Sequence, residues 1–176
     1  SFSNMGDKNT DVLSHGEYMF ITTLFKEPYI KYAKKVKFSS SEEVIYEIES
    51  KKTVKQINRL KCSASITAEI LKETFELLKV GMTEIEIANL TIEMTNKITE
   101  KYVGKKEISH FKMAWENCPI VLTGENFLKG GHSLPSDRPL KEGDTVYFDF
   151  GLKVVFNDGE RLYTDIQRMG YVLKKN

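Results

Sequence analysis

Two apolar runs near the C-terminal end of the chain each enclose one aspartate. Asp149 lies in Val146-Tyr147-Phe148-Asp149-Phe150, and Asp165 lies in Leu162-Tyr163-Thr164-Asp165-Ile166. Short runs of aromatic and β-branched residues predict strands, and a carboxylate inside such a strand is unfavourable unless something pairs with it. A divalent cation shared by the two carboxylates would remove that cost. The two runs therefore predict neighbouring strands that bring both aspartates to one metal site.

Asn157-Asp158-Gly159 lies between the two runs and is a strong hairpin signal. A hairpin centred on Asn157 places Asp149 opposite Asp165, with Cβ atoms about 4.5–5.5 Å apart. A two-residue turn at Asp158-Gly159 places Asp149 opposite Arg168 instead, unless a bulge intervenes. In the structural alternative, Asp165 bonds Arg168 or a turn, and neighbouring side chains satisfy Asp149. The residues by themselves leave both registers and both interpretations open.

His132 is the third candidate site residue. It lies in a loop over residues 125–142, rich in Gly and Pro, that leads into the first aspartate-bearing strand. We therefore expect its imidazole beside the two aspartates. Mn²⁺, Co²⁺, Fe²⁺ and Zn²⁺ suit oxygen ligands with some imidazole. His15 and His110 have no comparable context and are expected to be structural or exposed, and Trp115 is expected in the core or a pocket wall.

Two helices are predicted before these strands. The first covers residues 52–80, ends near Gly81, and has a core-facing apolar stripe of Ile57, Leu60, Ala64, Ala68, Leu71, Phe75 and Leu78. The second begins at the capping box Thr83-Glu84-Ile85-Glu86 and runs to about Tyr102, with Ile87, Leu90, Met94 and Ile98 inward. Strands are also expected from about Ser109 to Trp115 and from Pro119 to Gly124. Two antiparallel helices on an antiparallel sheet give an α+β fold.

The first 50 residues are too few for a full domain. Residues 17–25 predict a strand, residues 27–33 a short helix or turn, and residues 36–38 a second strand. Ser39-Ser40-Ser41 offers N-caps for a helix that runs to about Ile48. Residues 1–15 are polar and predict a loosely held arm.

Composition and charge limit the classes of partner. The chain has 176 residues and a net charge of +1, which argues against a large surface for nucleic acid or an anionic membrane. No run is long enough to span a bilayer, and no signal-peptide segment is present at the start. Cys62 and Cys118 form neither a disulfide framework nor a Cys-x-x-Cys pair. The expected location is the reducing cytoplasm.

A block of motifs in this chain resembles the metal-binding half of the pita-bread metallopeptidases, which include Xaa-Pro aminopeptidase, Xaa-Pro dipeptidase (prolidase), methionine aminopeptidase and creatinase. The block consists of His132-Ser133-Leu134-Pro135-Ser136-Asp137-Arg138, Gly143-Asp144, Asp149-Phe150-Gly151 and Asp165-Ile166-Gln167-Arg168. It looks closest to the Xaa-Pro branch. Gly81-Met82-Thr83-Glu84 is similar to a helix junction of the same family. The resemblance covers about residues 50–173, and residues 16–50 weakly resemble the end of a creatinase-type N-terminal domain.

The resemblance implies a fold, an activity and roles for three residues. Residues 1–50 would be an arm and the remnant of an N-terminal domain, and residues 51–176 the first half of a pita-bread catalytic domain. Asp149 would bind one metal ion with both oxygens, Asp165 would bridge two, and His132 would be the substrate-side histidine. The implied activity is hydrolysis of Xaa-Pro peptides by a metal-bridging hydroxide, with two Mn²⁺ ions, or Co²⁺, Fe²⁺ or Zn²⁺, in the complete enzyme.

The family's remaining ligands, a histidine and two glutamates, have no counterpart after Asp165 in this sequence. The expected explanation is a fragment or truncated form, inactive alone and holding few or no metal ions. Its open sheet edge would favour a homo-oligomer. Two alternatives remain: a non-catalytic pita-bread module that binds peptides or proteins, and a structural domain in which Asp149 is salt-bridged.

Overall fold

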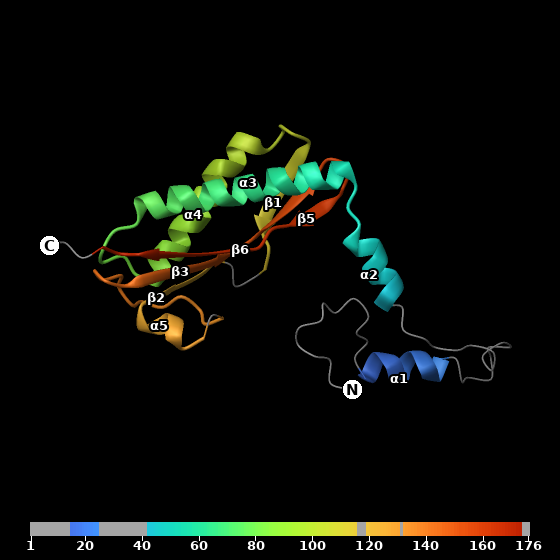
Figure 1. Ribbon diagram of the computed structural model, residues 1–176, viewed down its shortest axis with the longest axis horizontal. Helices are drawn as coiled ribbons and strands as arrows, with labels where there is room; N and C mark the ends of the chain where they lie inside the picture. The colour runs from blue at the N-terminus through green and yellow to red at the C-terminus, as the bar shows by residue number, and fades with distance from the viewer. Residues whose placement is uncertain (1–14, 25–41, 116–118, 131, 174–176) are drawn as a thin grey trace. The chain divides into compact units, whose positions relative to one another are not determined.

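The computed structural model describes residues 15–24, 42–115, 119–130 and 132–173 (Figure 1). The chain divides into two compact units, residues 1–53 and residues 54–176. The interpretation of residues 1–50 as the remnant of a larger domain, and of residues 51–176 as half of a catalytic domain, stays a prediction.

Two helices are described in the first unit. α1 covers His15–Leu24 and α2 covers Glu42–Ser50. The strand predicted for residues 17–25 is therefore wrong. A short apolar run does not by itself distinguish a strand from a helix, and here Thr22 fits the helix because its hydroxyl donates to the Tyr18 carbonyl at 2.8 Å. The helix expected up to Ile48 is confirmed as α2. The predicted elements at 27–33 and 36–38 lie outside the described residues.

Two long helices open the second unit. α3 covers Val54–Leu77 and α4 covers Glu84–Tyr102. The predicted capping box is present, because the Glu86 amide donates to the Thr83 hydroxyl and the Thr83 amide donates to the Glu86 carboxylate. Gly81 does not end α3: it lies four residues beyond the end, in the turn to α4, with φ of +95°.

The predicted core face of α3 is wrong in its first half and confirmed in its second, where Leu71 is buried and Phe75 and Leu78 pack against the core. Ala64 and Ala68 are exposed and Ile57 is 41% exposed. The buried face instead consists of Arg59, Ser63, Ile66, Thr67, Ile70, Leu71 and Thr74. Polar residues can occupy it because the hydroxyls donate to carbonyls one turn earlier, as from Ser63 to Arg59 and from Thr74 to Ile70, each at 2.9 Å. The predicted inward residues of α4 are buried or half-buried.

Six strands form two antiparallel sheets. Their bounds are Ile108–Met113 for β1, Ile120–Thr123 for β2, Thr145–Phe150 for β3, Leu152–Phe156 for β4, Arg161–Tyr163 for β5 and Ile166–Tyr171 for β6. The strand orders are β1-β4-β5 and β2-β3-β6. α3 and α4 lie on one side of the strands, and the short helix α5, Glu125–Leu128, lies on the other (Figure 1). The predicted α+β arrangement of helices on antiparallel strands is confirmed.

The predicted long hairpin is bent so that each of its arms belongs to both sheets. One arm becomes β3 and β4, separated at Gly151, and the other becomes β5 and β6. A side chain at position 151 would overlap the Thr164 carbonyl oxygen and lie 2.7 Å from the Trp115 ring. The close approach at the bend therefore requires glycine.

The hairpin tip is tied to α3 by the buried guanidinium of Arg59. One terminal nitrogen donates to Asp158 at 2.9 Å and also to Glu160, and the other donates to Glu107 at 2.6 Å. The guanidinium also stacks on the Phe156 ring, 4.4 Å from its centre. These contacts join α3, the start of β1 and the hairpin tip.

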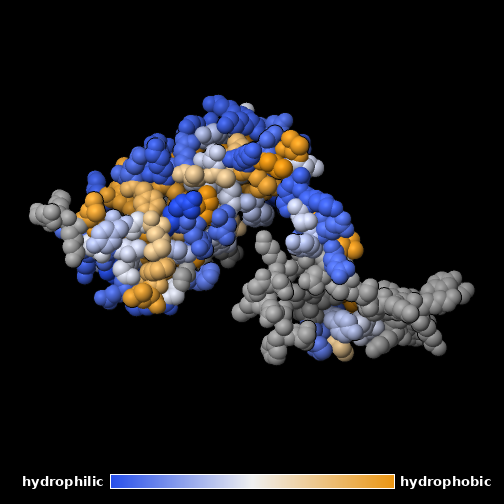
Figure 2. All heavy atoms as spheres, in the orientation of Figure 1, coloured by the Kyte–Doolittle hydropathy of each residue, from blue (hydrophilic) through white to orange (hydrophobic). Residues whose placement is uncertain are grey.

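Apolar side chains gather along α3 and β6 on the face shown in Figure 2. Among the described helices, none combines the length and the apolar character needed to cross a bilayer.

Candidate functional site

β3 places Asp149 on the side of the sheet away from α3. Side chains alternate along a strand, and Phe148 packs on Phe75 of α3, with ring centres 4.7 Å apart. Tyr147 points the other way and packs on Phe127 of α5, with ring centres 4.8 Å apart. Asp149 shares the face of Tyr147, so the strand that forms the core also carries a carboxylate to the opposite side.

The register of the hairpin differs from both predictions, by two residues from the first and by one from the second. Asp149 pairs with Gln167, rather than with Asp165 or Arg168. The tip is a three-residue loop, because the Phe156 amide donates to the Glu160 carbonyl at 2.9 Å and Gly159 has φ of +86°.

Asp165 nevertheless reaches the same side of the molecule as Asp149. It precedes β6 by one residue, two positions before Gln167, so it is a diagonal neighbour of Asp149 on one face. Within the described residues, Asp165 has no ion pair with Arg168, whose guanidinium donates to the Gln167 carbonyl. The structural alternative based on an Asp165–Arg168 bond is therefore not observed.

The three predicted site residues line one pocket of about 350 Å³. Its walls are Trp115, Ile120, His132, Asp149, Asp165 and Gln167. His132 and Asp165 are exposed, whereas Asp149 is only 4% exposed. The pocket thus combines a buried carboxylate, an accessible carboxylate and an accessible imidazole. His15 and His110 are exposed elsewhere, as expected.

Asp149 is poorly satisfied by the protein. Its Oδ2 accepts one long hydrogen bond of 3.4 Å from the Gln167 amide, and its buried Oδ1 has no partner among the described residues. Burial raises the pKa of Asp149 above its ordinary value, the neighbouring charge of Asp165 raises it further, and Gln167 and His132 oppose the shift. Burial and the Asp149 charge also raise the pKa of Tyr147. The pocket is therefore an environment in which a cation would be favoured.

The donors fit a divalent cation in part. Asp149 and Asp165 offer carboxylate oxygens, the ligand type that Mn²⁺ and similar ions accept, and the unsatisfied Oδ1 is the specific oxygen that lacks a partner. No group of three or more His, Cys, Asp or Glu side chains in the described part of the chain is arranged to hold a metal ion. The two aspartates are the candidate metal ligands. His132 also lines the pocket, but it is not placed to bind the same metal ion together with both aspartates.

The Pro-Ser-Asp-Arg and Gly-Asp motifs hold the loop that carries His132. Arg138 forms two hydrogen bonds to Asp144, at 2.7 and 3.0 Å, and a third to the Thr123 hydroxyl at 2.7 Å. A Cβ at Gly124 would lie 2.6 Å from the Asp144 carboxylate, so glycine is needed beside this pair. These motif residues support the pocket and do not line it.

Two residues of this pocket, Gln167 and Ile120, were not predicted from the sequence. Gln167 lies inside the motif block, but its role depended on the hairpin register. Ile120 lies in a fully buried apolar strand, and nothing local distinguishes it from a core residue. Trp115 is a pocket wall, one of the two places predicted for it.

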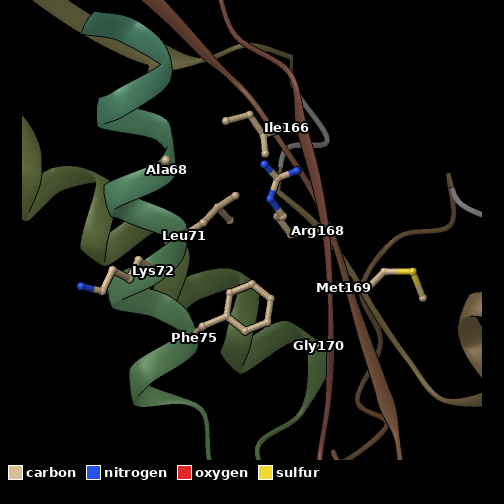
Figure 3. A pocket seen from close by; sticks show the side chains of 8 residues that line it. All are labelled: Ala68, Leu71, Lys72, Phe75, Ile166, Arg168, Met169 and Gly170. Atoms are coloured by element: carbon tan, nitrogen blue, oxygen red, sulfur yellow. The ribbon is translucent and has the colours of Figure 1, made fainter. Parts of the chain in front are cut away.

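A second pocket, of about 320 Å³, lies between α3 and β6 and carries no carboxylate or imidazole (Figure 3). Ile166 and Arg168 point from β6 toward Leu71 and Phe75 of α3, whereas Met169 points away. Its charged lining residues are Lys72 and Arg168, so the lining offers no carboxylate or imidazole to a metal ion.

Helices over antiparallel sheets, with paired carboxylates on the far side, define part of a pita-bread fold. The chain belongs to metallopeptidase family M24, whose family profile matches residues 58–176. No curated protein matched the sequence.

Three solved structures illustrate the likeness in fold. They are the X-Pro aminopeptidase of Thermotoga maritima (TM-score 0.59, 21% identity), the prolidase of Pyrococcus horikoshii (0.64, 22%) and the Xaa-Pro dipeptidase of Bacillus anthracis (0.60, 20%). The matches cover 93%, 93% and 94% of this chain but only 39%, 40% and 39% of those chains, respectively. This chain thus spans about two fifths of the length of the structures it matches.

Proposed function

We propose that this chain carries the aspartate half of the metal site of a peptidase that cleaves near the N-terminus of Xaa-Pro peptides. The observation that supports this most directly is Asp149. Its buried Oδ1 lacks a hydrogen-bond partner among the described residues, in a pocket that it shares with Asp165 and His132. A carboxylate in that environment is stabilised by a cation more than by anything the neighbouring side chains provide.

Asp149 and Asp165 would hold Mn²⁺, or Co²⁺, Fe²⁺ or Zn²⁺. A divalent cation at such a site polarises a peptide carbonyl and lowers the pKa of a water molecule. His132 would bind and orient the scissile amide. Trp115 and Ile120 give the pocket apolar surface for a proline ring or an aliphatic side chain. The Xaa-Pro preference is supported by the motif block and by the names of the three structures above.

The pocket has too few donors for tight binding by this chain alone. Two carboxylates and one imidazole line the pocket. Among the described residues, no three His, Cys, Asp or Glu side chains are placed to hold one metal ion together. We expect weak metal binding and no measurable Xaa-Pro hydrolysis until further ligands are supplied. We also propose that the chain self-associates through the edge of its sheet, and that the protein is cytoplasmic.

Titration with Mn²⁺, followed by calorimetry or by the EPR signal of free Mn²⁺, tests the metal site. The wild-type chain should bind Mn²⁺, and Asp149→Asn should abolish most of the binding. Asp137→Asn is the matched control, because Asp137 is exposed and lies outside the pocket lining. Equal, negligible binding by all three proteins would contradict the metal site.

The same proteins also test the second candidate, a non-catalytic peptide-binding module. The absence of three grouped metal ligands among the described residues favours it. Binding of a proline-containing peptide in the presence of EDTA, unaffected by Asp149→Asn, would support the module over the peptidase. Binding that requires Mn²⁺ would support the peptidase.

A further inference from the structure

Glu84 is a fully buried carboxylate outside the proposed metal pocket. It is the first residue of α4, has no exposed surface, and accepts five hydrogen bonds. Two come from Thr123, through its amide at 2.6 Å and its hydroxyl at 2.9 Å. Two come from Ser136, through its amide at 2.9 Å and its hydroxyl at 2.7 Å, and one from the Asn126 amide at 3.1 Å.

These donors stabilise the ionised form. Burial alone would raise the pKa of Glu84, but the hydrogen bonds from Ser136, Asn126 and Thr123 outweigh it and leave the pKa below its ordinary value. An acid at the start of a helix is usually explained by the helix dipole. Here the carboxylate also has a partner in each of three other segments: the end of β2, α5 and the loop before β3.

The loop over residues 132–138 depends on these contacts. The amides of Ile85 and Glu84 donate to the carbonyls of Ser136 and Arg138, at 3.1 and 3.2 Å, so the loop backbone also caps α4. His132 forms no hydrogen bond with another described residue. Its place at the pocket is therefore set by the loop, and the loop is attached through Ser136 and Arg138.

We propose that Glu84 is a positioning residue, which holds the loop of residues 132–138 so that His132 faces Asp149 and Asp165. This inference rests on the proposed function, because it assigns Glu84 a task only if His132 acts at the pocket. Glu84 is too deeply buried and too fully bonded to touch a substrate itself.

The test uses Glu84→Gln in the full chain. The amide keeps the shape of the side chain but replaces one acceptor oxygen with an NH₂ group. That group would face the N–H and O–H donors that now bond to the carboxylate. Amide hydrogen exchange in residues 133–138 should become about tenfold faster. The His132 ring signal, one of only three histidine signals in the NMR spectrum, should shift and sharpen. Mn²⁺ affinity should stay within about threefold of wild type, because the loop supplies neither aspartate.

Ile98→Ala is the matched control. Ile98 is buried in the same helix, far along it from the loop, so its truncation lowers stability without loosening residues 133–138 selectively. Ser136→Ala provides a second route, because it removes one donor to Glu84 and leaves the carboxylate in place. It should produce the same local changes on a smaller scale, even if Glu84→Gln does not fold.

Each outcome is informative. Faster exchange confined to the loop in Glu84→Gln or Ser136→Ala, and absent in Ile98→Ala, supports positioning. Uniformly faster exchange in all three variants, with an unchanged His132 signal, would overturn it and leave Glu84 a purely structural residue. Absence of Mn²⁺ binding by the wild type would overturn the proposed function while the loop measurement remained valid.

Discussion

At the scale of single residues, the chain contains carboxylates in opposite electrostatic states. Asp149 is buried with one weak partner, and its pKa is raised first by burial. Asp144 is also shielded, but Arg138 binds it with two hydrogen bonds and lowers its pKa. Shielding from solvent therefore does not by itself determine the direction of the pKa shift. The available donors decide it.

Asp149→Asn should stabilise the metal-free protein at neutral pH. Because the folded-state pKa of Asp149 is raised, wild-type stability is lost as pH rises from the ordinary carboxyl value of 3.8 through the folded-state pKa. The variant should melt a few degrees higher in EDTA at pH 7.5, and the gap should close below pH 3.8. Scanning fluorimetry measures this, with Asp137→Asn expected to match wild type. A lower melting temperature for Asp149→Asn would contradict the burial argument.

Asp144→Asn should have the opposite effect. The hydrogen bonds from Arg138 lower the pKa of Asp144. The stability that the Asp144 carboxylate contributes to the fold is therefore fully present above the ordinary pKa of 3.8, and it is lost as pH falls through the lower folded-state pKa. We expect a loss of about 1–3 kcal/mol in the free energy of unfolding at pH 7, and a smaller loss in strong acid. Urea unfolding at both pH values provides the comparison, and a pH-independent loss would count against the ion pair as the cause.

At the scale of elements, α3 shows why an apolar stripe can mislead. The stripe centred on Ala64 and Ala68 is partly exposed, and the buried face carries three hydroxyl residues bonded back to their own helix. Ile70→Ala should therefore cost about 2–5 kcal/mol of unfolding free energy. Ala64→Ser on the predicted stripe should cost less than about 0.5 kcal/mol. Chemical denaturation measures both, and equal losses would favour the originally predicted face.

Substitution of Gly151 tests whether the bend in the hairpin requires glycine. Gly151→Ala places a Cβ against the Thr164 carbonyl and the Trp115 ring, so it should disturb the bend next to Asp165 and lower the melting temperature strongly. Gly159→Ala at the hairpin tip meets no atom within 4 Å and faces only its positive φ, a penalty of about 1–2 kcal/mol. A smaller loss for Gly151→Ala than for Gly159→Ala would contradict the close approach.

At the scale of the whole molecule, β6 is the last strand of its sheet, and its Met169 and Tyr171 are 58% and 59% exposed. An apolar edge strand favours pairing with another chain. Light scattering at tens of micromolar should therefore give a mass above that of the monomer. Met169→Lys should reduce the mass toward that of one chain. A monomeric wild type would contradict self-association.

Much of the second unit was predictable because its signals are local. The capping box at Thr83 and the strands around Asp149 depend on neighbouring residues, and the motif block indicated the family correctly. The strand predicted for residues 17–25 failed because a short apolar run suits either a strand or a helix. The predicted core face of α3 was wrong at Ile57, Ala64 and Ala68. The sequence does not show which hydroxyl side chains bond to their own helix and can therefore be buried.

The sequence by itself determined the α+β class, the family, and the three residues that meet at the pocket, because side-chain alternation and motif identity are local properties. Only the tertiary structure decided the register that pairs Asp149 with Gln167, the bend at Gly151, and the burial of Glu84. Each of these depends on contacts between segments distant in the chain. A shift of one residue in a hairpin changes every cross-strand pair while leaving the local pattern unchanged.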